Sequence, residues 1–374
     1  MTSFPILLAL AIVAPKDGSV VSTQRDGQKA YLEEKRTERF VRMDNPADRA
    51  KLLAIGSTQR PLRLAWEGET NAVYALTIAA NGGKTDAFVL TNRTDAWVTN
   101  LELDRGYRWT VRRIDSDESV SASFTTEPTA PRFLRAEGVS NFRDLGGWMT
   151  GSGKRVRENM IFRSAGLRSS SKSKGGLFSR KIELGDQRVT TNGIATLRND
   201  FGIRTDLELR TPQETAGMTD TLLGTNVAWK CISFAAYDLV DNVVRGREPF
   251  AKIFEIFTKE GNYPVLMHCS GGRDRTGTLA FLLNGLLGVE EDDLCRDWEA
   301  SVFSDAGMKF TSDRIVRLLD YLKTMPGSTL QERIEAYVKG CGVTDAEIAA
   351  FRAIMRSPDR LNATFGRVNA TDSE

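Results

Sequence analysis

The segment HCSGGRDRTG, at residues 268–277, constrains the fold more than any other part of the chain. The apolar stretch YPVLM, at residues 263–267, comes directly before it and is typical of a buried strand. The stretch TGTLAFLLNGLLG begins at Thr276, and its apolar residues nearly encircle a helix, which predicts burial against a sheet. Strand, glycine-rich turn and helix together predict a loop whose backbone N–H groups converge at a helix N-terminus, and this arrangement binds anions.

The side chains of this loop fit the chemistry of phosphate esters. Cys269 stands before the converging donors, which would stabilise its thiolate for attack on phosphorus and give a phosphocysteine intermediate. Arg275, six positions later, carries a planar fork that can bind two phosphate oxygens in a geometry that lysine cannot copy. Thr276 could donate its hydroxyl to the departing thiolate, and His268 is expected to fix the loop and favour the thiolate rather than act as a base. The other predicted phosphate-binding residues are Ser270, Gly271, Gly272 and Arg273.

This loop resembles the HCxxGxxR(S/T) signature of the protein tyrosine phosphatase superfamily. Its closer likeness is to the HCxxGKDRTG loop of an atypical bacterial group that acts on phosphotyrosine and sometimes on phosphoinositides. Three upstream blocks resemble the same group: NFRDLGG at 141–147, FRS at 162–164 and DLELRTPQE at 206–214. The resemblance covers about residues 132–357 and implies an α/β catalytic domain, with a central sheet flanked by helices, that needs no metal or organic cofactor. We expect the ionisable residues of these blocks to form ion pairs that support the loop, with direct contact to the substrate as the alternative: Asp144, Arg163, Asp206, Arg210 and Glu214.

Two aspartates are candidates for the general acid that protonates the leaving oxygen. Asp274 matches the aspartate within the signature of the atypical group and is placed first. Asp238 is placed second, because it lies about 30 residues before the cysteine, where many relatives carry the acid on a separate loop. The arginines beside Asp274 favour its carboxylate form, whereas a bound dianion favours the protonated form. A purely structural ion pair stays open for either aspartate.

The substrate class is left open by the loop sequence. Phosphotyrosine, with phosphoserine and phosphothreonine, is the first expectation, and a phosphoinositide or inositol polyphosphate is the alternative. Arg273 stands where the atypical group usually has lysine, which suits a multiply phosphorylated substrate or merely stabilises the loop. A phosphate-recognising binding module without turnover is the alternative outside the enzymes. The 51 basic and 49 acidic residues nearly cancel, so charge gives no indication of a nucleic acid partner or a membrane surface.

The numbers and spacing of histidine and cysteine argue against a metal site. A single histidine excludes a site built from several histidines, and no pair of the four cysteines has the spacing of zinc ligands. We therefore expect no metal site. The remaining cysteines, Cys231, Cys295 and Cys341, are expected to be core residues rather than resolving thiols.

The N-terminal residues 1–15 include an uncharged apolar run, MTSFPILLALAIVA, that is too short to span a bilayer. The run resembles the apolar region of a secretory signal, but it lacks a basic start, and Pro15 follows Ala14 at the expected cleavage position. We expect an extracytoplasmic protein, periplasmic or secreted, without stable membrane insertion. A buried N-terminal strand in a cytoplasmic protein is the alternative.

The rest of the chain divides by its patterns. Residues 16–54 are polar and predict a lead-in segment with a helix near 28–42, whereas residues 55–127 alternate between apolar and polar and predict a small β-sandwich. Within them LELDRGYRWTVRRID, at 101–115, resembles the late strands of a fibronectin type III domain. The basic stretch at 168–181 predicts a mobile loop or a lid that meets an anionic substrate, and residues 358–374 form a C-terminal tail.

Overall fold

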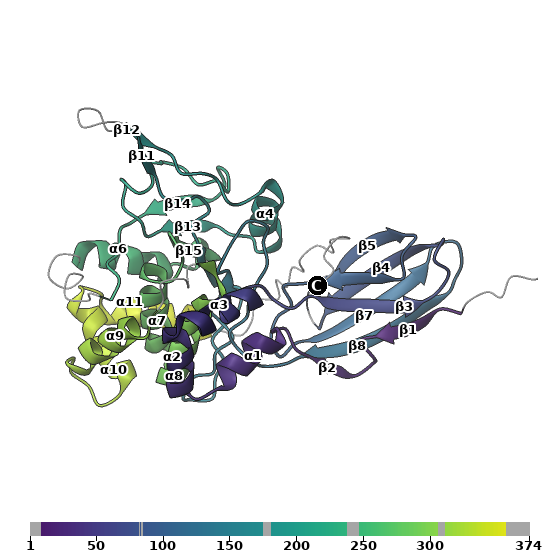
Figure 1. The fold of residues 1–374 in the computed structure, drawn as a ribbon, viewed down its shortest axis with the longest axis horizontal. Coiled ribbons are helices and arrows are strands. Elements are labelled where there is room, and N and C mark those ends of the chain that lie inside the picture. The colour runs from purple at the N-terminus through teal and green to yellow at the C-terminus, as the bar shows by residue number, and fades with distance from the viewer. Residues whose placement is uncertain are drawn as a thin grey trace, which may run out of the picture. The chain divides into compact units, whose positions relative to one another are not determined.

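The computed structural model describes residues 9–81, 83, 85–174, 181–237, 247–305 and 311–356 (Figure 1). The chain divides into two compact units. The first, the β unit, takes in the described chain up to Gln24 and Gln59–Thr129. The second, the α/β unit, takes in Arg25–Thr58 and the described chain from Ala130 onward. The chain therefore leaves the β unit once and returns to it before the α/β unit is completed.

The β unit consists of two sheets that share one hydrophobic core. In the smaller sheet, β3 (Leu62–Glu67) pairs with β1 (Ala11–Ala14) on one side and β6 (Asp95–Val98) on the other. The larger sheet has the order β2 (Ser19–Val21), β8 (Ser119–Thr126), β7 (Gly106–Arg113), β4 (Val73–Ala80) and β5 (Thr85–Thr91). Alternate residues of β4 and β7 are buried, and they share a cluster with Leu64 and Trp66 of the smaller sheet. The alternation seen in the sequence thus marks the inner faces of the two sheets.

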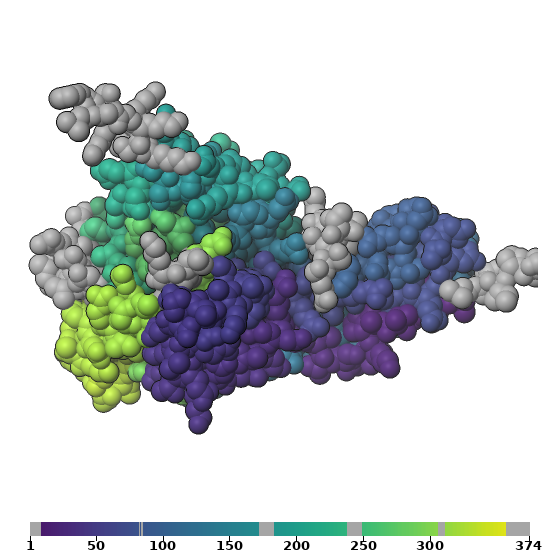
Figure 2. Space-filling model, in the orientation of Figure 1, coloured from purple at the N-terminus to yellow at the C-terminus, as the bar shows by residue number. Residues whose placement is uncertain are grey.

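The helices of the predicted lead-in segment belong to the α/β unit. They are α1 (Asp26–Glu33), α2 (Arg36–Asp44) and α3 (Pro46–Ile55). Their buried residues Tyr31, Leu32, Met43 and Leu52 join the main core of that unit. In Figure 2 these dark purple and blue residues lie against the yellow-green C-terminal helices, where Ser312 donates hydrogen bonds to Asp44. The segment is therefore an insertion between β2 and β3 rather than a leader to the chain.

The α/β unit is built on a five-stranded sheet of order β14 (Ala228–Cys231), β13 (Thr205–Glu208), β15 (Val265–Cys269), β10 (Ile161–Ala165) and β9 (Arg143–Asp144). The first four strands are parallel, and β9 runs antiparallel to β10. In the register, Cys269 of β15 lies beside Ala165, and His268 lies beside Glu208. The carboxyl ends of these strands therefore meet at one edge of the sheet, where α/β proteins commonly bind ligands.

Helices cover both faces of this sheet, as the α/β prediction requires. On one face pack α6 (Arg247–Phe257), α7 (Arg275–Leu287), α8 (Glu291–Glu299), α9 (Asp313–Lys323), α10 (Leu330–Gly340) and α11 (Asp345–Arg356). On the other face α4 (Thr191–Ala195) leads into a π-helical turn at Thr196–Asp200. There Leu197 and Phe201 pack on Phe162 and Leu266. Among the helices that the structure describes, none combines the length and the apolar surface needed to cross a bilayer.

Candidate active site

The loop after β15 is held by side chains that bind its carbonyl groups. Asn141 Nδ2 donates to the carbonyl of Gly271 at 2.9 Å, and Arg163 Nη2 donates to that of Gly272 at 2.8 Å. The C=O and N–H of a trans peptide point in opposite directions, so the N–H groups that follow these carbonyls point away from the scaffold. Gly272 has a φ of +69°, and a Cβ there would lie 2.2 Å from the carbonyl oxygen of Ser164. The position therefore requires glycine.

Arg163 is itself fixed by a buried ion-pair network. Its Nη1 binds Asp297 Oδ2, and Arg143 Nε binds the other oxygen of Asp297 at 3.0 Å. Burial works against the Asp297 carboxylate, but Arg163 and Arg143 hold its pKa below the usual range. Asn141 also donates to Ser301 Oγ at 3.2 Å. The expectation of supporting ion pairs is confirmed for Arg163. Through Arg163 and Asn141, the FRS and NFRDLGG blocks both contact the loop.

Asp144, a block residue, has a different role. Its Oδ2 accepts from Arg132 at 2.9 Å, and its Oδ1 accepts from the backbone N–H of Gly146 at 2.8 Å. The carboxylate is completely buried and shapes the turn after β9. It supports the fold of the NFRDLGG block and makes no contact with the loop in the described residues.

His268 is buried between two carboxylates of β13. Its Nε2 lies 2.6 Å from Asp206 Oδ1, and its Nδ1 lies 3.4 Å from Glu208 Oε2. Burial disfavours the imidazolium, but Glu208 and Asp206 outweigh it and raise the pKa of His268 to about 8. A positive ring thus lies one residue before Cys269, whose side chain is 3% exposed.

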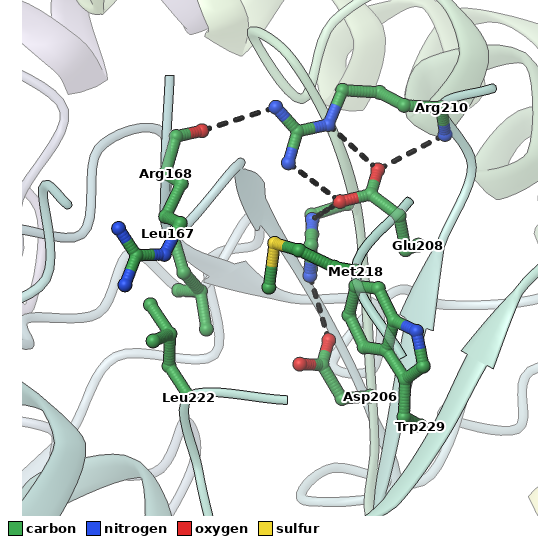
Figure 3. Close-up of a pocket in the computed structure, with 9 residues that line it drawn as sticks. Leu167, Arg168, Asp206, Glu208, Arg210, Met218, Leu222 and Trp229 are labelled. Carbon is green, nitrogen blue, oxygen red and sulfur yellow. Dashed lines mark hydrogen bonds and ion pairs between the residues drawn. The ribbon is translucent and has the colours of Figure 1, made fainter. Parts of the chain in front are cut away.

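A small cavity of about 10 Å³ is lined by His268 and by the residues labelled in Figure 3. These include Trp229, Met218 and Leu222, and also the Glu208–Arg210 ion pair. This volume suits about one water molecule. Cys269 and Arg275 do not line the cavity, so it belongs to the support of His268 rather than to the phosphate site.

Arg275 begins α7 and is held by Glu214 in a bidentate ion pair. Its two terminal nitrogens each lie 2.7 Å from one carboxylate oxygen of Glu214. The pair lowers the pKa of Glu214 to about 2, with a further contribution from the backbone N–H of Thr211. The same ion pair raises the pKa of Arg275. Glu214 therefore fixes the orientation of the predicted phosphate clamp.

Asp274 takes part in several hydrogen bonds in this structure. Arg273 binds it through Nε at 3.0 Å and through Nη2 at 2.9 Å, and the Tyr237 hydroxyl donates to its Oδ1 at 2.8 Å. Trp298 Nε1 donates in turn to Tyr237 at 3.0 Å. Tyr237 and Trp298 carry no motif and were not singled out from the sequence. The second candidate acid, Asp238, lies outside the described residues.

The basic stretch after β10 contacts the predicted phosphate-binding loop near the start of the stretch. Its ends form β11 (Lys172–Lys174) and β12 (Lys181–Glu183), which pair as a hairpin. Ser170 Oγ of this stretch lies 2.9 Å from Ser270 Oγ. Arg188, which follows the stretch, donates to the Ser270 carbonyl at 3.3 Å. The described part of the stretch thus borders the predicted phosphate-binding loop.

A further predicted residue, Thr276, fits the loop chemistry. Thr276 is buried, and its hydroxyl has no hydrogen-bond partner among the described residues, which leaves it available to a departing thiolate. Cys295 and Cys341 are buried core thiols, and Cys231 is half-buried with its Sγ 3.6 Å from the Arg210 carbonyl. None of the four cysteines, all of which the structure describes, forms a disulfide.

Comparison with known proteins places this site in a family. The model described as "Tyrosine phosphatase family" matches residues 134–357. A protein of Cupriavidus necator named as a tyrosine-protein phosphatase is 30% identical over 186 residues, which are 46% of this chain and 66% of that relative. The crystal structure of the core catalytic domain of the PP-IP phosphatase SIW14 from S. cerevisiae, in complex with citrate, is 18% identical. It covers 52% of this chain and 97% of that one with a TM-score of 0.26, which is too low to carry an argument.

Proposed function

Because the chain belongs to the tyrosine phosphatase family, we propose that it is a cysteine-dependent phosphatase that hydrolyses phosphomonoesters through a phosphocysteine intermediate. One observation carries the proposal. Cys269 ends the central strand in front of the N-terminus of α7, and the first residue of that helix, Arg275, is oriented by Glu214. Nucleophile, backbone donors and clamp are thus brought to one place by a single loop.

The reaction follows from these positions. The Cys269 thiolate attacks phosphorus, the S–P bond forms, and the bond from phosphorus to the leaving oxygen breaks. Arg275 and the loop N–H groups bind the three equatorial oxygens, whose charge is largest in the transition state. Asp274 supplies the proton to the leaving oxygen. Water then attacks the phosphocysteine, and the thiolate leaves with a hydrogen bond from Thr276 while inorganic phosphate is released.

The substrate class that we place first is phosphotyrosine, followed by phosphoserine and phosphothreonine. The bacterial relative named as a tyrosine-protein phosphatase supports this choice. The chain covers 66% of that relative, so its activity is an argument by similarity. We assign the chain to the atypical bacterial branch on the four sequence blocks. A phosphate-binding module without turnover is the alternative outside the enzymes.

A phosphoinositide or inositol polyphosphate is the second candidate substrate, and it is favoured by the arginines around the loop. Arg188 is exposed and contacts the Ser270 carbonyl. Arg273 adds a second guanidinium within the loop itself. Several cations near one phosphate site suit a substrate with several phosphate groups.

A release assay separates these candidates. Phosphotyrosine peptide, phosphoserine peptide, phosphoinositide and phytate are compared at matched concentrations with the wild type and with Arg188→Ala. Phosphotyrosine is expected to give the highest kcat/KM, with little change in the variant. A preference for the inositol substrates that is lost in Arg188→Ala would replace the first choice by the second. Phosphate binding without release from any of the four would favour the binding module.

We also propose that the β unit is fibronectin type III-like. Its sheet orders, β1-β3-β6 and β2-β8-β7-β4-β5, support this, as does the Tyr107 hydroxyl, which accepts a hydrogen bond from the backbone N–H of Glu102 at 2.8 Å. A tyrosine bonded to the backbone a few residues upstream is a recurring corner of such sandwiches. The helical insertion after β2 is a departure from that fold.

We also propose that the protein is exported by a cleaved N-terminal signal, and the N-terminal sequence of the mature protein tests this. Cleavage after Ala14 would remove β1, which pairs with β3. N-terminal sequencing of protein from the periplasm or medium of its host is expected to show a processed end. An intact Met1 on that protein would count against export by this signal.

A further inference from the structure

Two aromatic residues form a directed chain of hydrogen bonds that ends on Asp274. Trp298 Nε1 lies 3.0 Å from the Tyr237 hydroxyl, which lies 2.8 Å from Asp274 Oδ1. An indole N–H can only donate. The tyrosine oxygen is therefore the acceptor of the first bond, and its own hydrogen is directed to the carboxylate. Burial, and then the Asp274 charge, raise the pKa of the Tyr237 hydroxyl, so it stays a donor at any physiological pH.

The chain of donors is held from several sides. Trp298 is completely buried, Tyr237 is 8% exposed, and their rings meet edge to face with centroids 6.2 Å apart. The backbone N–H of Tyr237 donates to Thr278 Oγ1 of α7 at 3.3 Å. Tyr237 has a φ of 59°, a conformation that is unfavourable for a bulky side chain. Backbone outliers of this kind cluster at functional sites, where the surroundings enforce them.

We infer that Tyr237 and Trp298 are positioning residues for proton transfer from Asp274. The inference rests on the proposed phosphatase function. Because Tyr237 occupies Oδ1, the transferable proton is carried by Oδ2, the oxygen that Arg273 Nη2 contacts at 2.9 Å in this structure. Bound phosphate attracts Arg273 and frees that oxygen. As the bond to the leaving oxygen breaks, the proton passes from Oδ2 to that oxygen.

We call the hydrogen bonds from Trp298 to Tyr237 and from Tyr237 to Asp274 the relay. The relay contributes most after the proton has left Asp274. Asp274 is then a carboxylate again, and the Tyr237 hydroxyl donates to it. A hydrogen bond that strengthens as charge develops lowers the barrier of the step. Among the described residues, the charged groups that face the relay are Arg273 in the loop and Arg314 of α9, whose guanidinium lies 5.9 Å from the Tyr237 ring centroid. Both remain in Tyr237→Phe, so this variant removes the hydroxyl alone.

A series of aryl phosphates with leaving phenols of increasing pKa tests the relay. For Tyr237→Phe, kcat is expected to fall by about 3-fold or less with 4-nitrophenyl phosphate and by about 10-fold or more with phenyl phosphate, because only the poorer leaving group needs the proton. Trp298→Phe, which keeps an aromatic ring, should show the same trend with a smaller loss. KM should change little in both variants. The slope of log kcat against phenol pKa therefore becomes steeper.

A matched control is Tyr263→Phe, which removes a buried hydroxyl that donates to the Phe257 carbonyl at 2.6 Å, away from the loop. Its slope should equal that of the wild type. A uniform loss across the series for Tyr237→Phe means a structural role only and overturns the inference. If Trp298→Phe does not fold, Tyr237→Phe decides alone, since it retains the ring contacts.

Asp274→Asn separates this inference from the proposed function. It should steepen the slope more than either aromatic variant, with about a 100-fold loss for phenyl phosphate. A steep slope for Asp274→Asn together with an unchanged slope for Tyr237→Phe overturns the relay and leaves the acid in place. An unchanged slope for Asp274→Asn overturns both assignments, while turnover by Cys269 would still stand.

Discussion

Glu214→Gln tests how far the orientation of Arg275 depends on its ion pair. The carboxylate receives both terminal nitrogens of Arg275 at 2.7 Å. Its pKa falls from 4.5 to about 2, and this shift is equivalent to about 3 kcal/mol. The backbone N–H of Thr211 accounts for part of it. The side chain is 31% exposed, so solvent screening reduces the share of Arg275 to about 1–2 kcal/mol.

Two effects are expected from the substitution. The glutamine keeps an oxygen for one donor but loses the charge and the second equivalent acceptor, so Arg275 samples orientations that do not fit phosphate. A decrease of about 10-fold to 100-fold in kcat/KM follows from such misplacement. The free energy of unfolding should fall by about 1–2 kcal/mol near neutral pH. A depressed carboxylate pKa stabilises the fold above pH 4.5, and this contribution disappears as the pH falls through about 2.

The assay combines steady-state kinetics on 4-nitrophenyl phosphate with urea unfolding followed by tryptophan fluorescence. The matched control is Glu335→Gln, which breaks a surface ion pair between Glu335 and Arg352 on the C-terminal helices, where Nη2 lies 2.8 Å from Oε2. That variant should keep its kcat/KM. If Glu214→Gln retains the activity of the wild type, Arg275 does not depend on Glu214 for its orientation, and the argument is refuted.

The remaining predictions concern the support of the loop. Gly272→Ala should lower kcat by more than about 10-fold, because its Cβ would meet the Ser164 carbonyl at 2.2 Å; circular dichroism and kinetics check that the fold survives. Asp297→Asn should cost about 3–5 kcal/mol in urea unfolding, since it leaves Arg163 buried without its charged partner, and a loss below about 1 kcal/mol would contradict the network. His268 has a raised pKa of about 8, so its stabilising contribution is complete below its ordinary value of 6.5 and is lost as pH rises through about 8. The wild type should therefore lose more stability between about pH 6 and about pH 9 than His268→Gln, and equal losses would contradict the assignment.

The sequence predicted the parts of the site that are local in the chain. The loop from His268 to Thr276 fixes strand, turn and helix within a few residues, so its geometry follows from local chemistry. The block residues Arg163 and Glu214 were expected to form ion pairs, and the structure supplies their partners, Asp297 and Arg275. Asp297 could not be found in advance, because it lies on an ordinary amphipathic helix, and only tertiary packing brings it to Arg163.

Other features depend on the course of the whole chain. The helices of residues 25–58 have a polar composition that is typical of a lead-in segment, but they pack into the core of the α/β unit through a few buried side chains such as Tyr31 and Leu52. Tyr237 and Trp298 are 61 positions apart, and neither belongs to a motif. Their contact with Asp274 arises from tertiary packing, which the pattern of a single segment does not encode.

The most direct test of the central claim is rapid acid quenching during turnover of an aryl phosphate, followed by peptide mapping of the trapped enzyme. In the wild type we expect a phosphorylated peptide that contains Cys269. In Asp274→Asn this peptide should be enriched only if the substitution also slows hydrolysis of the phosphocysteine intermediate. Cys269→Ser should bind inorganic phosphate without turnover. Continued turnover by Cys269→Ser, with no phosphate on the Cys269 peptide of the wild type, would contradict a cysteine nucleophile.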